Sequence, residues 1–421
     1  MGDALIENPT PFEASLIRAY EARPAPTPAQ TAAMARFARQ RMPHRRVEGW
    51  KWSDFNAALN AAPAQDAPNG AERAAGGIVI APSAFASLNP VEVRIVGGRP
   101  DHPAAEDLPR GVRIAVARTT ALAPELESHP ILSLNAAMAD DALTLEIEAG
   151  AAPGRPILIR HILAGAAPVF VRTAVRVGAG ASVEILETYE GAGPVLYSHF
   201  CGMTVGASAR VERTAVQDAG GEGVFHALCA ATLDEAARYD QTTLSAGARL
   251  ARHETHLHYA GDGASARMDS AALVGGSRHC DITTHVRHDG AGCETRQVHK
   301  GVAKDRARTV FQGKFHVLPG AQKTDADMQA NALLLSDTAE ANHKPELEIY
   351  ADDVECAHGS TAGALDEDAL FYLRQRGLDE RTARALLIEA FVGEAIDAIG
   401  RDEVRLALQA LVSGWLEEAE A

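Results

Sequence analysis

The chain has 421 residues, of which 56 are acidic and 40 basic, giving a formal net charge of −16. This acidic balance argues against a nucleic-acid or anionic-membrane partner, because both of these carry negative charge themselves. The five cysteines are scattered and form no CxxC pair, which argues against a zinc ribbon or a disulfide scaffold. The sequence predicts neither a signal peptide nor a membrane span, so we expect the protein in a reducing cytoplasm.

The N-terminal part predicts helices followed by a linker. Residues 11–42 show helical apolar spacing on both sides of an interruption by prolines. Residues 48–55 (EGWKWSDF) form a compact aromatic cluster, whose two tryptophans we expect to anchor packing. Residues 60–76 consist largely of Ala, Pro, Gln, Asn and Gly, a composition typical of linkers. We therefore place an N-terminal helical domain and its linker at residues 1–76.

The long middle part predicts β-structure. Between residues 77 and 355 apolar residues recur with a period of two, and Gly-Ala turns separate short alternating runs at uneven intervals. We expect no helices between these strands, and their number exceeds what a single closed sandwich needs. The sequence therefore predicts a mainly β protein, with a right-handed parallel β-helix core at residues 77–355 flanked by N- and C-terminal α-helical domains.

The C-terminal part changes to helical spacing, and we place a helical domain at residues 356–421. Asp366 predicts a helix start and Gly377 its stop, while Asp379 predicts the cap of the next helix. A further helix is expected from about residue 402 to 415. The helix that follows Asp379 is expected to bury an apolar stripe formed by Ala383, Leu386, Leu387, Ala390 and Phe391.

Cys356 and His358 stand where the strand pattern gives way to the helical one. On an extended segment both side chains leave the same face, roughly 6.5 to 7 Å apart at the backbone. A thiol and an imidazole are metal ligands, and this spacing suits a cluster or a site shared with a second chain better than one mononuclear ion. The last strand of a sheet also has an edge at which another chain can pair. From the residues alone, a functional and a structural role are equally open.

Two other groups could carry chemistry. His256 and His258 would share a face of a strand and, joined by His253 or a distant carboxylate, could ligate zinc or iron in a metalloenzyme. The ordinary interpretation is that exposed strand faces tolerate histidine. Asp325 and Asp327 could be the paired acids of a β-helix carbohydrate-active enzyme, although a turn accounts for them equally well.

Standard enzyme motifs are absent from the sequence. No GxxxxGK[ST], GxSxG or HExxH occurs, so a P-loop mechanism of nucleotide hydrolysis is excluded. Alternation around Cys280 places its thiol on an apolar face, where we expect it to be buried and inert.

Several stretches resemble the SufD members of the SufB/SufD family, which belong to the SUF iron–sulfur cluster assembly machinery. The match is strongest over the last third of the chain. The matching stretches are 48–54 (EGWKWSD), 311–314 (FQGK), 322–325 (QKTD), 333–336 (LLLS), 344–354 (KPELEIYADDV), 356–359 (CAHG) and 370–377 (LFYLRQRG). The resemblance implies a β-helix core between helical domains, and a chain that is a scaffold rather than an enzyme.

The resemblance also implies partners and a site. It implies pairing with a SufB-like paralogue through the β-helix ends, and recruitment of a SufC-like ATPase by the C-terminal helices. The histidine of the Cys-x-His-Gly motif, His358 by position, would lie at the interface with SufB and face a SufB cysteine, with Cys356 beside it. We expect no cofactor bound stably by the isolated chain, and a transient iron–sulfur cluster or iron in the complex. The exposed solenoid end further predicts a homodimer when the chain is isolated.

Overall fold

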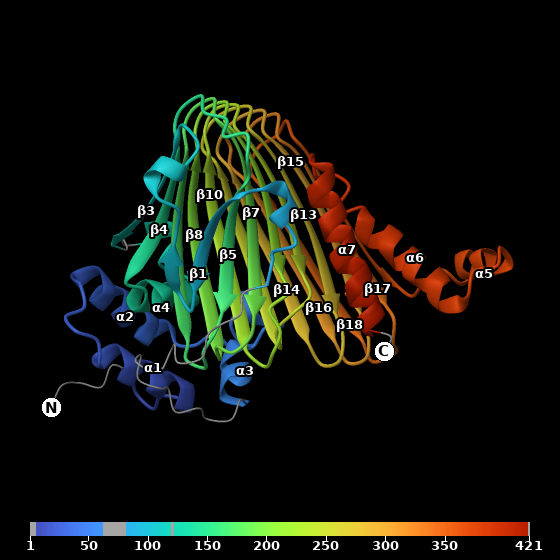
Figure 1. Cartoon of the computed structure of the whole chain (residues 1–421), viewed down its shortest axis with the longest axis horizontal. Coiled ribbons are helices and arrows are strands. Elements are labelled where there is room, and N and C mark those ends of the chain that lie inside the picture. The colour runs from blue at the N-terminus through green and yellow to red at the C-terminus, as the bar shows by residue number, and fades with distance from the viewer. Residues whose placement is uncertain (1–5, 62–80, 119–121, 420–421) are drawn as a thin grey trace.

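The computed structural model describes residues 6–61, 81–118 and 122–419, which form a β-solenoid with helices near both ends of the chain (Figure 1). The predicted mainly β fold, with a parallel β-helix core and flanking helices, is confirmed. The predicted linker at 60–76 lies outside the described residues from position 62 onward, as does the predicted boundary between positions 76 and 77.

The N-terminal helices are α1 (Pro11–Glu21), α2 (Pro28–Gln40) and α3 (Phe55–Ala61), with the 3-10 turn η1 (Glu48–Trp50) before α3. Both α1 and α2 begin with a capping box, in which Thr10 or Thr27 accepts a hydrogen bond from the backbone N–H three residues later. Each also has proline in its first turn, where a missing N–H costs nothing. Local sequence therefore suffices to start these helices.

The solenoid consists of two sheets, and each full coil contributes one strand to each. One sheet contains β1 (Val91–Val96), β2 (Arg99–Asp101), β5 (Ile157–Leu163), β7 (Ser182–Gly191), β9 (Arg210–Gln217), β11 (Arg238–Ser245), β13 (Ser265–Val274), β15 (Glu294–Ala303), β17 (Asp325–Leu334) and β19 (Glu355–Gly363). The other contains β3 (Val112–Arg118), β4 (Asp141–Ile147), β6 (Val169–Val177), β8 (Leu196–Val205), β10 (Val224–Leu233), β12 (Leu250–Tyr259), β14 (His279–His288), β16 (Arg308–Val317) and β18 (Glu340–Ile349). Neighbouring strands are parallel except in the β1–β2 and β3–β4 pairs, which are antiparallel. The short 3-10 turns η2 (Ala86–Leu88), η3 (Ala105–Asp107) and η4 (Pro124–Leu126) lie near the first coil.

Successive coils stack in register although their lengths differ. In-register positions lie 28, 28, 27, 29, 31 and 30 residues apart, along the series Ser182, Arg210, Arg238, Ser265, Glu294, Asp325 and Glu355. The corners bring backbones very close together: a Cβ at Gly223 would lie 2.3 Å from the carbonyl oxygen of Pro194. Only glycine fits there, which explains why glycine marks the turns.

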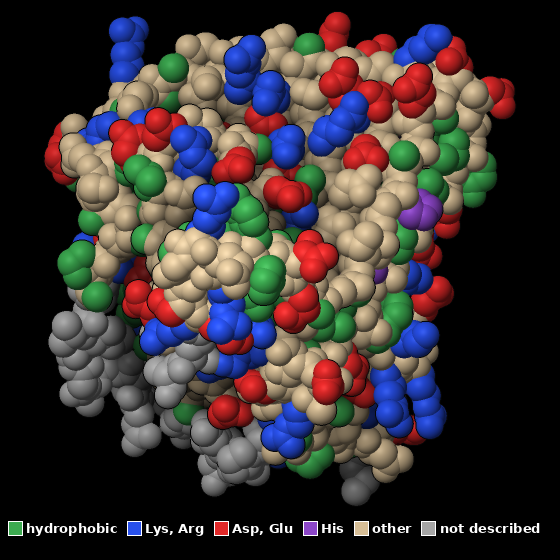
Figure 2. Space-filling model, turned by 90° about the vertical axis from the view of Figure 1, so that its right-hand side faces the viewer, with side chains coloured by type: hydrophobic (Ala, Val, Ile, Leu, Met, Phe, Trp, Pro, Cys, Tyr) green, Lys and Arg blue, Asp and Glu red, His purple; other side chains and the backbone are tan. Residues whose placement is uncertain are grey.

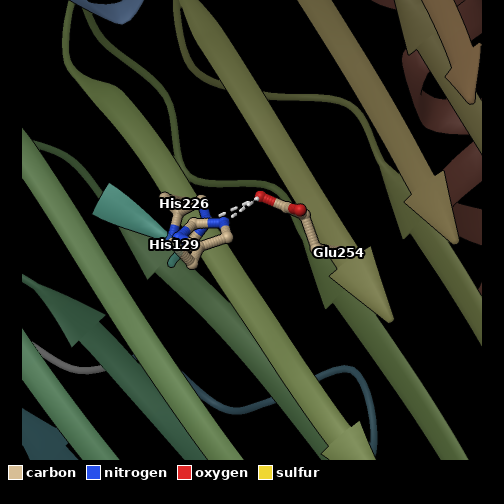
Figure 3. A group of neighbouring side chains, drawn as sticks. All are labelled: His129, His226 and Glu254. Atoms are coloured by element: carbon tan, nitrogen blue, oxygen red, sulfur yellow. Dashed lines mark hydrogen bonds and ion pairs between the residues drawn. The ribbon is translucent and has the colours of Figure 1, made fainter. Parts of the chain in front are cut away.

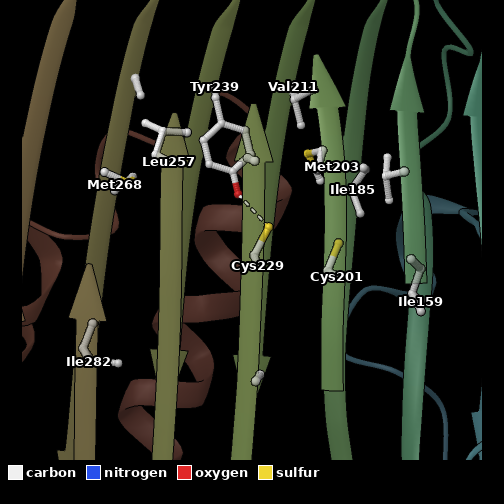
Figure 4. Close-up of a cluster of buried hydrophobic side chains, with 14 of the residues drawn as sticks. Ile159, Ile185, Cys201, Met203, Val211, Cys229, Tyr239, Leu257, Met268 and Ile282 are labelled. Atoms are coloured by element: carbon white, nitrogen blue, oxygen red, sulfur yellow. Dashed lines mark hydrogen bonds between the residues drawn. The ribbon is translucent and has the colours of Figure 1, made fainter. Parts of the chain in front are cut away.

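Inward-facing side chains of both sheets fill the solenoid. Cys201 and Cys229 are in register on β8 and β10, and the Tyr239 hydroxyl lies 3.7 Å from the Cys229 sulfur (Figure 4). The predicted burial of Cys280 is confirmed, since it is fully buried and burial raises the pKa of its thiol to about 12. A protonated, enclosed thiol is a poor nucleophile, so Cys280 acts in packing.

Helices cover the outer faces of both sheets. The N-terminal helices and α4 (Pro130–Met138) pack on the sheet that contains β8 and β10, through Phe200, Leu228 and their neighbours. The C-terminal helices pack on the other sheet, through Leu244 and Leu273. Helix α4 contradicts the prediction that no helix interrupts the strands. Its residues from 131 to 137 are all buried, so it lacks the one-sided apolar pattern that identifies a surface helix.

The end of the solenoid differs from the prediction. Strand β19 occupies Glu355–Gly363, so the predicted start of the C-terminal helical domain at residue 356 is wrong by nearly a whole strand. Its small polar residues give no apolar alternation that a pattern search could detect. After it come α5 (Glu367–Gln375), capped by Asp366, α6 (Glu380–Gly393), capped by Asp379, and α7 (Asp402–Ala419). Both predicted caps are confirmed, and α5 projects from the body of the molecule (Figure 1).

The predicted stripe of α6 is only partly correct. Ala383, Ile388 and Val392 are the buried residues of this helix, whereas Leu386 is 43% exposed. None of the helices within residues 6–61, 81–118 and 122–419 combines the length and the hydropathy needed to cross a membrane.

Candidate functional site

Cys356 and His358 lie on β19, the last strand of its sheet. They are in register with Ala326 and Met328 of β17, whose side chains are buried in the solenoid core. In-register residues of parallel strands share a face, so the thiol and the imidazole both point to the inner face of the last coil. The predicted shared face is confirmed. Cys356 is half-buried against the core, whereas His358 is exposed.

The inner face of this last coil also contains two residues that the sequence analysis did not single out. His343 on β18 and Ser360 on β19 face each other, with 2.7 Å between the imidazole Nδ1 and the hydroxyl oxygen. The other ring nitrogen of His343, Nε2, is buried and has no hydrogen-bond partner. The alternation that places Leu347 and Ile349 on one face of a strand extends back to His343, and this signal could have identified it.

The electrostatic setting of Cys356 favours its neutral form. Partial burial raises the pKa of the thiol, and the nearby Asp325 carboxylate raises it further. The thiol therefore keeps its proton at neutral pH, and binding of a metal ion there must displace it.

Two strand edges beside this site have no neighbouring strand among the described residues. Within that part of the chain, β19 ends one sheet and pairs only with β17, while β18 ends the other sheet and pairs only with β16. The surrounding charges are mostly paired, as in Lys314–Glu348, at 2.7 Å, and Lys323–Asp353. Acidic and basic side chains intermingle over this end of the molecule (Figure 2).

The predicted three-histidine site does not form. His256 and His258 share the outer face of β12 as expected, but His253 faces inward, with its Nε2 3.2 Å from the Ser245 hydroxyl. The Nε2 of His258 instead lies 3.1 Å from the carboxylate oxygen Oδ2 of Asp289. Since side chains alternate along a strand, a ligand set at positions 253, 256 and 258 cannot converge.

The two carboxylates of the predicted acid pair have different hydrogen-bond partners. Asp325 and Asp327 lie in β17 rather than in a turn, because the turn ends earlier, at Lys323. The Asp325 carboxylate accepts two hydrogen bonds from Arg296, at 3.0 and 2.5 Å, whereas Asp327 accepts from Gln329. Asp325 is thus engaged by a guanidinium and Asp327 by a side-chain amide, so the two carboxylates do not form a free acid pair, and the glycosidase interpretation has no structural support.

Two His/Glu groups among the described residues were missed by the sequence analysis. His129, His226 and Glu254 meet between α4 and the solenoid (Figure 3), and His161, Glu187 and His199 meet inside it. Consecutive members are 97 and 28 residues apart in the first group and 26 and 12 in the second, so no local motif marks them.

The first group has the hydrogen-bonding pattern of a structural anchor. His129 Nδ1 accepts a hydrogen bond from the backbone N–H of Leu132, so its Nε2 carries the proton and donates to Glu254 at 3.0 Å. His226 Nε2 lies at the same distance from this carboxylate, and Arg252 donates to it at 2.9 Å. Glu254 is thus already satisfied by three donors, and the His129 tautomer leaves no lone pair for a metal ion.

In the second group the carboxylate and one of the two histidines are likewise occupied, whereas His161 Nε2 is buried without a hydrogen-bond partner. Arg213 donates to Glu187, and this guanidinium holds the pKa of the carboxyl below its ordinary value although burial raises it. Both nitrogens of His199 have hydroxyl partners, Tyr189 at 2.8 Å and Thr173 at 3.0 Å. The group therefore holds the two sheets together rather than presenting a ligand set.

The aromatic cluster at residues 48–55 packs beside the first group. Trp50 is buried. The guanidinium carbon of Arg252 lies 4.1 Å from the centre of its ring, and the ring centre of Phe55 lies 4.9 Å from it. The predicted packing role of Trp50 is therefore confirmed. Ser53 donates to Asp281 on β14. These contacts fix the N-terminal helices on the solenoid wall, and the same segment reaches the last coil, where Glu48 lies 3.1 Å from the Lys344 ammonium on β18.

Comparison with known proteins identifies a related family. Residues 161–391, more than half of the chain, match the family described as "SUF system FeS cluster assembly, SufBD core domain". The chain is 29% identical over 374 residues to the iron-sulfur cluster assembly protein SufD of Escherichia coli, and the match covers 86% of each chain.

Two further relatives match over shorter segments. An iron-sulfur cluster assembly SufBD family protein of Synechocystis is 45% identical over 119 residues, which cover 28% of this chain and 26% of the relative. The chloroplastic protein ABCI7 of Arabidopsis thaliana is 34% identical over 174 residues, covering 41% of this chain and 37% of the relative.

Proposed function

The chain belongs to the SufBD family of the SUF system, and we propose that it is a non-catalytic scaffold subunit for iron–sulfur cluster assembly. It pairs with a SufB-like chain through the last coil of its solenoid. A SufC-like ATPase binds the helices that follow. The cluster is the cargo of this assembly and is passed on to another protein.

The observation that supports the proposal is the placement of Cys356 and His358 on the inner face of a terminal strand, which among the described residues has a neighbouring strand on one side only. A thiolate and an imidazole are ligands for iron and for iron–sulfur clusters. Two ligands leave the remaining coordination positions to a partner whose strand edge meets β19. A cluster shared across a separable interface is released when that interface opens, as a scaffold requires.

The free edges of β18 and β19 supply the pairing surface for the SufB-like chain. They also give the isolated chain a surface on which a second copy can bind, and hence a homodimer. Since a strand edge offers backbone groups along its whole length, either partner adds hydrogen bonds without new side-chain chemistry.

The C-terminal helices supply the surface for the ATPase. Phe371 and Tyr372 on the projecting helix α5 are 64% and 57% exposed, and Leu406 on α7 is 62% exposed. Exposed aromatic residues on a projecting element are typical of interface anchors. Movement of a bound ATPase would act on the last coil through the short connection from β19 to α5.

The test is replacement of His358 by alanine in the complex co-expressed with a SufB-like chain and a SufC-like ATPase. We expect iron and sulfide content of the purified complex to fall to a small fraction of the unchanged complex, with the same subunit composition. The control is His316→Ala, because His316 lies at the same end of the solenoid but on the outer face of β16. Equal cluster content in the His358 variant would refute the proposal.

A further inference from the structure

A chain of polar contacts crosses the outer face of the sheet that ends in β19. Lys300 on β15, Asn331 on β17 and Thr361 on β19 are in register, one on each of three neighbouring strands. The Lys300 ammonium donates to the Asn331 side-chain carbonyl at 3.2 Å, and the Asn331 amide donates to the Thr361 hydroxyl at 2.7 Å. Side chains therefore connect the terminal strand to β15.

The other end of this chain of contacts is helix α6. Glu394, which directly follows α6, accepts a hydrogen bond from the Lys300 ammonium at 2.5 Å, and the centre of the Phe391 ring lies 4.7 Å from the ammonium nitrogen. The Lys300 side chain is 5% exposed, whereas that of Glu394 is 65% exposed. A buried ammonium without its counter-ion is strongly unfavourable, so Lys300 depends on α6 staying docked on β15.

The sequence of α6 indicates that Glu394 serves this tertiary contact. An acidic side chain is disfavoured at the C-terminus of a helix by the helix dipole, and α6 has no basic residue in its last turn. Lys300 supplies from β15 the cation that the helix itself lacks. A residue that breaks a local rule in this way is explained by an interaction elsewhere in the fold.

The contacts end beside the candidate site. Thr361 shares β19 with Cys356 and His358 and lies on the opposite, outer face of that strand. Within the described residues β19 has a neighbouring strand on one side only, so it lacks the second row of backbone hydrogen bonds that an inner strand has. Side-chain contacts on its outer face therefore contribute a larger share of its order.

We propose that these contacts form a latch, through which docking of α6 on β15 orders the terminal strand β19. The latch consists of Glu394, Lys300, Asn331 and Thr361. Lifting of α6 removes the counter-ion of Lys300, the ammonium then turns toward solvent and leaves Asn331, and β19 loses its outer-face support. Lys300 and Asn331 are thus positioning residues, because they act on the thiol and the imidazole through the strand. The functional consequence rests on the proposed function: an ordered β19 presents the site to the partner, and a released β19 does not.

The test measures hydrogen–deuterium exchange of the full-length chain at neutral pH, by mass spectrometry of peptides that cover β19, α6 and the middle coils. Glu394→Gln keeps the shape of the side chain and removes its charge. We expect exchange in β19 to become about 10-fold faster, because a hydrogen bond between charged groups is lost at the α6 end of the latch. Asn331→Ala leaves the ion pair of α6 in place, so exchange should become about 2- to 10-fold faster in β19 and stay unchanged in α6.

Glu389→Gln is the matched control, because Glu389 is a glutamate of the same helix that accepts a hydrogen bond from Ser413 of α7, at 2.5 Å, rather than from the sheet. It should leave exchange in β19 unchanged. The double variant of Glu394→Gln and Asn331→Ala should accelerate β19 by less than the product of the two single effects, since both act along one route.

Four results would each overturn the latch. The first is unchanged exchange in β19 for Glu394→Gln, and the second is equal acceleration in β19 for Glu389→Gln. The third is a double variant whose effect is the full product of the single effects. The fourth is the same acceleration in every strand of Glu394→Gln, which would show a loss of overall stability rather than release of β19.

The latch and the proposed function fail in different ways. If exchange in β19 accelerates in Glu394→Gln but His358→Ala leaves the cluster content of the complex unchanged, the latch stands and the proposed site is wrong. If His358→Ala lowers the cluster content while exchange in β19 stays unchanged in Glu394→Gln, the proposed function stands and the latch is wrong.

Discussion

Glu13 is expected to make the stability of the N-terminal helices depend on pH. Its carboxylate is 2% exposed and accepts hydrogen bonds from the backbone N–H groups of Thr10 at 2.9 Å and Met42 at 3.0 Å, and from Arg41 at 2.7 and 3.0 Å. Burial raises the pKa of this carboxyl, but the bonds from Arg41 and the backbone outweigh burial and lower it from 4.5 to about 2.

The sign of the effect follows from the lowered pKa. Because the folded protein holds the proton less tightly than the unfolded chain, the stabilisation is complete above pH 4.5 and is lost as the pH falls toward 2. A difference of roughly 2.5 pKa units corresponds to about 3 kcal/mol at pH 7. At pH 3.5 the unfolded chain is already mostly protonated at this position, so about half of the stabilisation remains.

The experiment compares the unchanged chain with Glu13→Gln by urea unfolding, followed by tryptophan fluorescence at pH 7 and pH 3.5. We expect the variant to lose about 3 kcal/mol at pH 7 and about half of that at pH 3.5. Glu21→Gln, an exposed position of the same helix, should change little at either pH. An equal loss at both pH values would show that the carboxylate charge does not stabilise the helices.

Three further outcomes test the packing and the reactivity of the chain. Gly223→Ala should lower the free energy of unfolding of the solenoid in urea by about 1–3 kcal/mol. Gly220→Ala should leave it unchanged, because a Cβ at position 220 would meet open space. Equal losses in the two variants would contradict the close stacking of the corners. Ile388→Ala should lower the free energy of unfolding by about 2–5 kcal/mol, because this side chain is buried. Leu386→Ala should lower it by less than about 1 kcal/mol, because Leu386 is exposed. A larger loss at Leu386 would contradict the face of α6 that is buried in the structure. Alkylation of Cys356, followed by mass spectrometry, should be slower at pH 7 than for free cysteine and accelerate as the pH rises, because its thiol pKa is raised; fast alkylation at pH 7 would contradict this.

The parts of the fold that were predicted correctly are those with a local physical signal. The period of two identified the strands, and Asp366 and Asp379 marked helix starts because capping depends only on residues within one turn. Helix α4 and strand β19 were missed for the opposite reason: one is buried on all sides and the other has almost no large apolar residues. In both, tertiary packing rather than local pattern decides the structure.

The candidate site was predictable in part for the same reason. Cys356 and His358 are two residues apart on one strand, so the sequence alone indicates their shared face. His343 comes from the other sheet, and only the closing of the coil brings it to Ser360. The prediction that His253 joins His256 in one site was wrong. The two residues are three positions apart on β12, and an odd separation places side chains on opposite faces of a strand.

The architecture explains why the chemistry is located at one end. Along most of the solenoid the inner face is sealed between sheets, and helices cover the outer faces. The first coil ends in the antiparallel strands β2 and β3, and within the described residues these strands, like β18 and β19, each have a neighbour on one side only. At the last coil the inner-facing thiol and imidazole lie beside the edges of β18 and β19, and a partner that pairs with these edges must cover them. Under the proposed function, iron and the SufB-like chain meet at the same strand. Linkage then requires that iron and the SufB-like chain each raise the affinity of the chain for the other by the same factor. The assembled complex therefore holds iron more tightly than the separated chain, and opening of the interface releases the cluster.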